Sequence, residues 1–106
     1  MLHDWDFFET VDNKALRDLV VSLQSKRHIN KGEAEVLNAM IENGATGAML
    51  VADFESFCPQ SRREMERNLQ SMFLRDLLDI VYNGGWVYAA QAMWPKLILL
   101  DNRPGQ

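Results

Sequence analysis

The sequence has few residues that can bind a metal ion or form covalent links. Its 106 residues include one cysteine, Cys58, and two histidines, His3 and His28. A single cysteine excludes an internal disulfide, and a structural zinc site needs four ligands, mostly cysteine or histidine. The histidines do not form a helical pair of the H-x-x-x-H type. We therefore expect no bound metal ion, and we interpret Cys58 as a small buried apolar side chain.

The sequence also lacks the short motifs that mark common active sites. Its six glycines never fall into the phosphate-loop pattern G-x-x-x-x-G-K-[ST], the dinucleotide pattern G-x-G-x-x-G or the nucleophile elbow G-x-S-x-G. Nothing in the sequence indicates that Cys58 and His28 act together as nucleophile and base. We therefore expect no cofactor and no catalytic residue, so the chain is predicted not to be an enzyme.

Long apolar runs and a basic N-terminal leader are absent as well. No run approaches the roughly 18 apolar residues of a membrane span, and the first residues, MLHDWDFFE, do not resemble a signal peptide. The formal net charge is −4 and the pI is about 5.0. The sequence thus predicts a single cytoplasmic domain without membrane contact. The acidic balance disfavours general nucleic-acid binding, although a local basic face could still bind.

The apolar residues that are present favour helices. Helices are predicted over residues 13–28, 31–42 and 47–57, and Asn30 with Glu33 fits a capping box for the second of them. A long helix is predicted over residues 62–82, from Ser61 as the N-cap to a stop at residues 83–85. Its apolar face has steps of three and four residues: Met65, Leu69, Met72, Phe73, Leu77, Ile80 and Val81. The predicted fold is all-α, a compact bundle of four to six helices around this long helix.

The C-terminal quarter of the chain is less well defined by its pattern. Residues 86–94 are predicted to be helical, because four apolar side chains there share one helical face. Residues 96–100 fit either a helical turn or a short strand, since the run is too short to show a period. Residues 101–106 are expected to form a flexible tail.

Residues 1–12 combine acidic and aromatic side chains. Trp5 and Phe8 are three residues apart, so they could dock a short N-terminal helix onto the core. Alternatively, the same residues could form a linear motif that binds a groove on another protein.

Arg62 and Arg63 occupy the first turn of the predicted long helix. Positive charge there opposes the helix dipole, by up to about 1 kcal/mol per exposed residue. Exposed helices do carry such arginines without a functional reason. The alternative is that the two guanidinium groups bind an acidic partner or a phosphate backbone.

Large aromatic side chains near the C-terminus suggest an interaction surface. Trp86 and Trp94, together with two tyrosines and six methionines, are many adaptable apolar side chains for a chain of this length. Most of them are expected to fill the core. Any that remain exposed would mark a contact with a partner or with a second copy of the chain.

The leading functional hypothesis is a small acidic interaction module that acts as a regulator, inhibitor or adaptor by binding another protein. A homodimer is compatible with this hypothesis. The predicted partner-binding residues are Trp5, Phe8, Arg62, Arg63, Trp86 and Trp94.

The alternative hypothesis is a DNA-binding regulator with a helix-turn-helix at residues 31–57. The basic side chains available for it are Lys26, Arg27, Lys31, Arg62 and Arg63. Residues 47–53 provide no arginine, lysine, glutamine or asparagine to contact a base, which weighs against that location. A third hypothesis, an enzyme subunit whose site is completed by a partner, has less support.

Overall fold

A computed structural model describes residues 13–45 and 47–104. These residues form five helices and a three-stranded antiparallel sheet, so the prediction of an all-α bundle is wrong. The elements in chain order are α2 (Asn13–Ser25), α3 (Lys31–Glu42), β1 (Met49–Leu50), α4 (Val51–Phe57), α5 (Arg62–Leu74), β2 (Leu78–Asn83), β3 (Trp86–Ala92) and α6 (Trp94–Asp101).

The first two described helices agree with the sequence. α2 ends three residues before the predicted boundary, and Arg27 follows it with a positive φ of 63°. The capping box of α3 is confirmed: Asn30 accepts a hydrogen bond from the backbone N–H of Glu33, whose carboxylate accepts one from the backbone N–H of Asn30. These reciprocal bonds satisfy two free amide groups and fix the start of α3.

The predicted helix at residues 47–57 is shorter than expected. Met49 and Leu50 form β1, which pairs with β3, and the helix α4 begins only at Val51. Strand pairing in this segment depends on residues some 40 positions later, so local periodicity does not reveal it.

The long helix predicted over residues 62–82 is the largest error. α5 ends at Leu74, and Asp76 has a positive φ of 66°, which stops the helix. The chain then forms β2, a two-residue turn at Gly84 and Gly85, and β3. Both glycines have positive φ, 63° and 91°, as a tight type I′ hairpin turn requires. The helix predicted at residues 86–94 is therefore also wrong, because most of this segment is the strand β3.

Helix α6 settles the undecided segment at residues 96–100, which is helical. Pro95 lies in its first turn, where the missing N–H of proline costs no hydrogen bond. Trp94 at its start is fully buried, and its indole N–H donates a hydrogen bond of 2.9 Å to the carbonyl of Ala45. This bond ties the end of the sheet to the end of α3.

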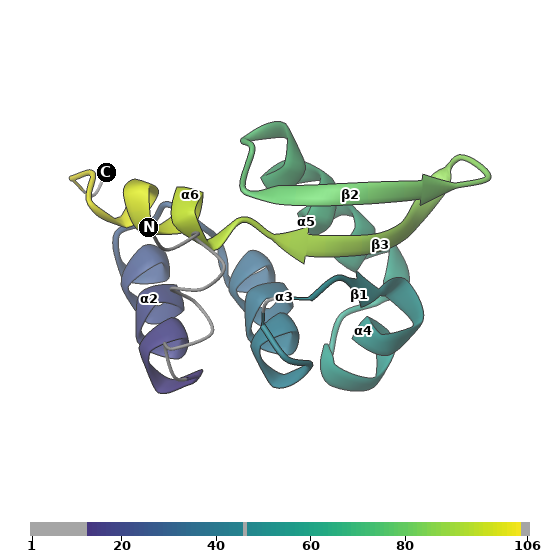
Figure 1. The fold of residues 1–106 in the computed structure, drawn as a ribbon, viewed down its shortest axis with the longest axis horizontal. Helices are drawn as coiled ribbons and strands as arrows, with labels where there is room; N and C mark the ends of the chain where they lie inside the picture. Colours follow the sequence, from purple (N-terminus) through teal and green to yellow (C-terminus); the bar gives the residue numbers. More distant parts are fainter. Residues whose placement is uncertain (1–12, 46, 105–106) are drawn as a thin grey trace, which may run out of the picture.

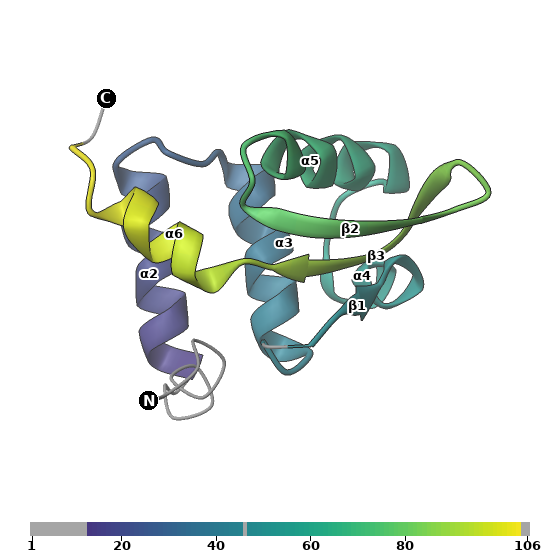
Figure 2. The same ribbon diagram turned by 45° about the horizontal axis from the view of Figure 1, so that its top comes forward.

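The strands pack against helices α3, α4 and α5. In Figure 1, α2, α3 and α4 stand side by side below the strands, and Figure 2 shows α5 running alongside β2. The turn of the β2–β3 hairpin projects at the end of the molecule opposite to α2 and α6. No helix among the described residues combines the length and apolar character needed to cross a membrane.

The sheet has one buried face and one partly exposed face. The strand order is β1-β3-β2, and residues paired across antiparallel strands share a face. Met49, Ala90 and Ile80 form one such row, and all three are buried in the core. The neighbouring row points the other way: Leu50 is 42% exposed and Val81 is 55% exposed, on either side of Ala89.

Candidate functional site

Helices α4 and α5 are joined by a short turn of the length found in helix-turn-helix motifs. Only four residues, 58–61, separate Phe57 at the end of α4 from Arg62 at the start of α5. Such motifs join two helices by a turn of three or four residues. Ser61 caps α5 by accepting a hydrogen bond of 3.2 Å from the backbone N–H of Glu64, as the sequence predicted.

The turn of this motif is fixed to α3 by Gln60. The side-chain amide of Gln60 donates hydrogen bonds to the carbonyl of Gly32 at 2.7 Å and to the carboxylate of Glu35 at 2.8 Å. Its side-chain oxygen accepts a hydrogen bond of 2.8 Å from Asn68 on α5. One side chain therefore connects α3, the turn and α5, which holds α5 against α3. Gly32 permits this approach, since a Cβ atom there would overlap Asn68.

Helix α5 has a buried stripe and an opposite polar row. Met65, Leu69 and Met72 are buried in the core. Because a helix turns about 100° per residue, the side chains on the far side of α5 belong to residues 63, 67, 70 and 74. We name this exposed set the α5 row: Arg63, Arg67, Gln70 and Leu74.

The two arginines of the α5 row are free to contact a ligand. Within residues 13–45 and 47–104, neither Arg63 nor Arg67 has an ion-pair partner. Arg62 differs, because its guanidinium lies 3.3 Å from the carboxylate of Glu66 and 3.9 Å from that of Glu55. The positive charge of Arg62 is thus partly neutralised, whereas that of Arg63 and Arg67 is not.

A hollow lies beside the first turn of α5. It has a volume of about 430 Å³ and lies where β1, α4 and the start of α5 meet the hairpin. The hollow contains side chains of three kinds: aromatic, aliphatic and polar. We name it the hairpin hollow; its lining is Leu50, Val51, Ala52, Glu55, Arg62, Asn83, Trp86, Val87 and Tyr88.

Trp86 has a defined place in the hairpin hollow although it is 53% exposed. A Cβ atom at Gly84 would lie 3.1 Å from the Trp86 ring, so the indole packs directly on the hairpin turn. Tyr88 on the same strand is also exposed. The hairpin therefore presents two aromatic rings to solvent next to Arg62.

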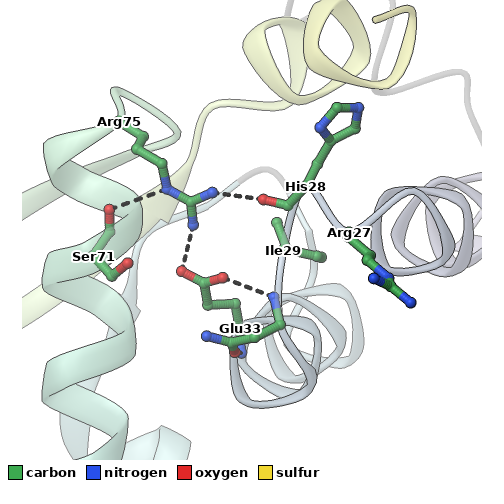
Figure 3. Close-up of a pocket in the computed structure, with 7 residues that line it drawn as sticks. Arg27, His28, Ile29, Glu33, Ser71 and Arg75 are labelled. Carbon is green, nitrogen blue, oxygen red and sulfur yellow. Dashed lines mark hydrogen bonds and ion pairs between the residues drawn. The ribbon is translucent and has the colours of Figure 1, made fainter. Parts of the chain in front are cut away.

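A second hollow, at the junction of α2, α3 and α5, is lined by a network of polar contacts (Figure 3). Arg75 pairs with the buried carboxylate of Glu33 and donates hydrogen bonds to the carbonyls of His28, at 2.6 Å, and Ser71, at 3.4 Å. Glu33 also caps α3 through the backbone N–H of Asn30. These bonds join the end of α5 to the α2–α3 loop, which is a structural role, so this hollow is not a ligand-site candidate.

The structure separates the predicted partner-binding residues. Arg62 and Trp86 line the same hollow, and Arg63 lies in the exposed α5 row beside it. Trp94 is 0% exposed and bonded within the core, so it offers no surface to a partner. Trp5 and Phe8 lie outside the described residues.

The alternative hypothesis assigned a helix-turn-helix to residues 31–57, where the structure has a strand between the two helices. At residues 31–57, β1 lies between α3 and α4, and α4 exposes the acidic side chains of Asp53 and Glu55 but no basic one. The short connection between two helices is instead that of α4 and α5, and Gln70 on α5 was not among the predicted site residues. Its spacing from Arg63 and Arg67 was the signal that could have identified it.

Nucleophile and metal chemistry find no support in the described part of the chain. Cys58 is buried and its thiol donates a hydrogen bond of 3.6 Å to the carbonyl of Glu35. Burial, with a smaller contribution from the charge of Glu35, raises the pKa of the Cys58 thiol to about 11, so it is protonated near neutral pH. The described residues contain no group of three or more histidine, cysteine or acidic side chains placed to hold a metal ion.

Comparison of the chain with protein-family models, with curated proteins and with solved structures gave no match.

Proposed function

We propose that this protein binds duplex DNA through the α4–α5 helix-turn-helix, with α5 in the major groove. The observation that supports it is the α5 row, which places Arg63, Arg67 and Gln70 on the solvent side of the second helix. In helix-turn-helix proteins the second helix enters the major groove, and its N-terminal side chains contact base edges. Arginine pairs with guanine and glutamine with adenine in that groove.

The spacing of the α5 row suits neighbouring base pairs. Arg63 and Gln70 are seven residues apart, which is about 10 Å along a helix that rises 1.5 Å per residue. Successive base pairs are about 3.4 Å apart. The row can therefore reach about three consecutive base pairs, the number that one recognition helix commonly reads.

The acidic side chains of α5 do not cancel the charge of this row. The Glu64 carboxylate accepts a hydrogen bond from the hydroxyl of Ser61, the N-cap residue, and Glu66 forms an ion pair with Arg62. Among the described residues, neither Arg63 nor Arg67 forms an ion pair with these acidic groups. The net charge of −4 thus belongs to the whole chain, and the exposed face of α5 carries locally positive charge.

The β-hairpin that follows α5 adds a structural parallel. A helix-turn-helix followed directly by an antiparallel hairpin is the arrangement called a winged helix, and the described elements have that order. A fold alone does not determine function. The proposal therefore rests on the side chains of α5, and the hairpin is a second element that could reach the nucleic acid.

The test is a binding titration with a fluorescent duplex pool of random sequence, at about 50 mM salt, followed by selection of preferred sequences. The double variant Arg63→Ala/Arg67→Ala should bind at least about tenfold more weakly, since each arginine contact contributes on the order of 1 kcal/mol or more. Arg17→Ala, at an exposed site on α2, is the matched control and should bind like the wild type. Equal binding by all three proteins would refute the proposal.

A second candidate function, a module that binds another protein, is favoured by the exposed apolar side chains of the sheet. Leu50 and Val81 lie on its outer face on either side of Ala89, and Leu50 lines the hairpin hollow with Trp86 and Tyr88. Such a cluster can cover a partner's working surface, as a regulator, inhibitor or adaptor would. The test is capture of partners from nuclease-treated extract with the wild type and with Val81→Lys. A stoichiometric partner lost only from the variant would favour this candidate.

A further inference from the structure

We propose that the hairpin hollow binds an unpaired DNA base, such as one at the end of a duplex, next to the duplex contact of α5. The inference rests on the proposed function, because it assigns a second contact to the same nucleic acid. The volume of about 430 Å³ is in the range of ordinary small-ligand sites and accommodates a single planar ring system.

The aromatic side chains supply the stacking surface that a base requires. Trp86 and Tyr88 both line the hollow and are about half exposed. Bases stack on such rings without regard to sequence, because every base has a flat π-face. Packing on Gly84 already holds the Trp86 ring against the turn, so little conformational freedom is lost on binding.

The polar side chains of the hollow are placed for the rest of a nucleotide. Asn83, which pairs with Trp86 at the end of the hairpin, carries an amide that can bond a base edge. Arg62 lies on the lining with its side chain about half exposed, and its guanidinium can contact the adjoining phosphate. The acidic Glu55 lies beside it, which favours the amino group of a base over a second phosphate at that position.

The charge of the hairpin explains why the base should be unpaired. Residues 76–95 contain no lysine or arginine, so the hairpin has no cation to follow the backbone of a duplex. Its exposed aromatic rings need the flat face of a base, which is hidden inside a stacked duplex. A base at a duplex end or in a single strand exposes that face. We therefore assign the duplex backbone to α5 and the unpaired base to the hairpin.

The experiment compares a blunt fluorescent duplex of random sequence with the same duplex carrying a three-thymidine overhang. At about 50 mM salt, the wild type should bind the overhang duplex about tenfold more tightly, as expected for one stacked base. Its tryptophan emission should fall on binding that DNA. Trp86→Leu should lose both effects and bind both DNAs as the wild type binds the blunt duplex, while Trp86→Phe should keep part of the gain.

Tyr82→Leu is the matched control, because Tyr82 is an exposed aromatic residue of the same hairpin that does not line the hollow. It should preserve the gain. Equal wild-type affinity for the two DNAs, or a gain that survives in Trp86→Leu, would overturn the inference and leave the duplex proposal standing. Failure of the wild type to bind either DNA would overturn both.

Discussion

Cys58 shows how a single side chain can be structural despite its reactive chemistry. It closes α4, where its backbone N–H donates a hydrogen bond of 2.8 Å to Phe54, and its thiol donates to the carbonyl of Glu35 on α3. The thiol thus takes part in the same junction as Gln60. The junction sets the position of the turn before α5, so Cys58 serves the proposed site without touching a ligand.

The raised pKa of Cys58 leads to a prediction about reactivity and pH. Because its pKa is about 11 in the folded protein against a reference of 9.0, the thiol should react with iodoacetamide at pH 8.5 far more slowly than in urea-unfolded protein. The unfolded thiol ionises first, so its contribution to stability is full below pH 9 and is lost as the pH rises from about 9 to about 11. Mass spectrometry measures the alkylation rate. Equal rates in folded and unfolded protein would contradict the assignment.

At the scale of the elements, the first half of the fold could be predicted and the second could not. The start of α3 could be predicted, because the side chains of Asn30 and Glu33 accept hydrogen bonds from each other's backbone N–H groups within one helical turn. After Leu74 the apolar residues fit a helix and a strand about equally well. The deciding signal was the pair of glycines at the turn, with β-branched and aromatic residues on both sides. Reading those glycines as a helix stop produced the error.

The candidate site likewise has features that could be predicted from the sequence and features that could not. The positions of Arg62 and Arg63 at a helix start follow from the Ser61 cap, which is a local feature. The exposure of Trp86 and the burial of Trp94 depend on which strands pair and on the hydrogen bond to Ala45. Both are contacts between distant parts of the chain, and no local pattern specifies them.

The conformation of the β-hairpin turn can be tested by substituting Gly84. Gly84→Ala should destabilise the protein by about 1–2 kcal/mol, since φ is 63° there and the new Cβ would press on the Trp86 ring. Gly47→Ala is the control, because a Cβ at Gly47 meets no atom within 4 Å. Urea denaturation measures both variants. Equal stability of the two would show that the turn does not have the conformation described here.

The whole molecule combines a net charge of −4 with a small cationic face on α5. At most three arginines, Arg62, Arg63 and Arg67, can neutralise phosphates, so the logarithm of the affinity should fall with a slope of at most about −2.7 against the logarithm of salt concentration. Affinity should then drop no more than about 40-fold between 50 and 200 mM salt. Strongly basic DNA-binding proteins lose roughly 10³–10⁵ over that range.

This limit separates the two candidate functions in one titration series. Anisotropy at four salt concentrations gives the slope for DNA. Association with a protein through the apolar outer face of the sheet should change little over the same range, because burial of apolar surface is only weakly salt-dependent. A DNA slope much steeper than −2.7 would require cations outside α5, and would therefore move the DNA contact away from the helix-turn-helix.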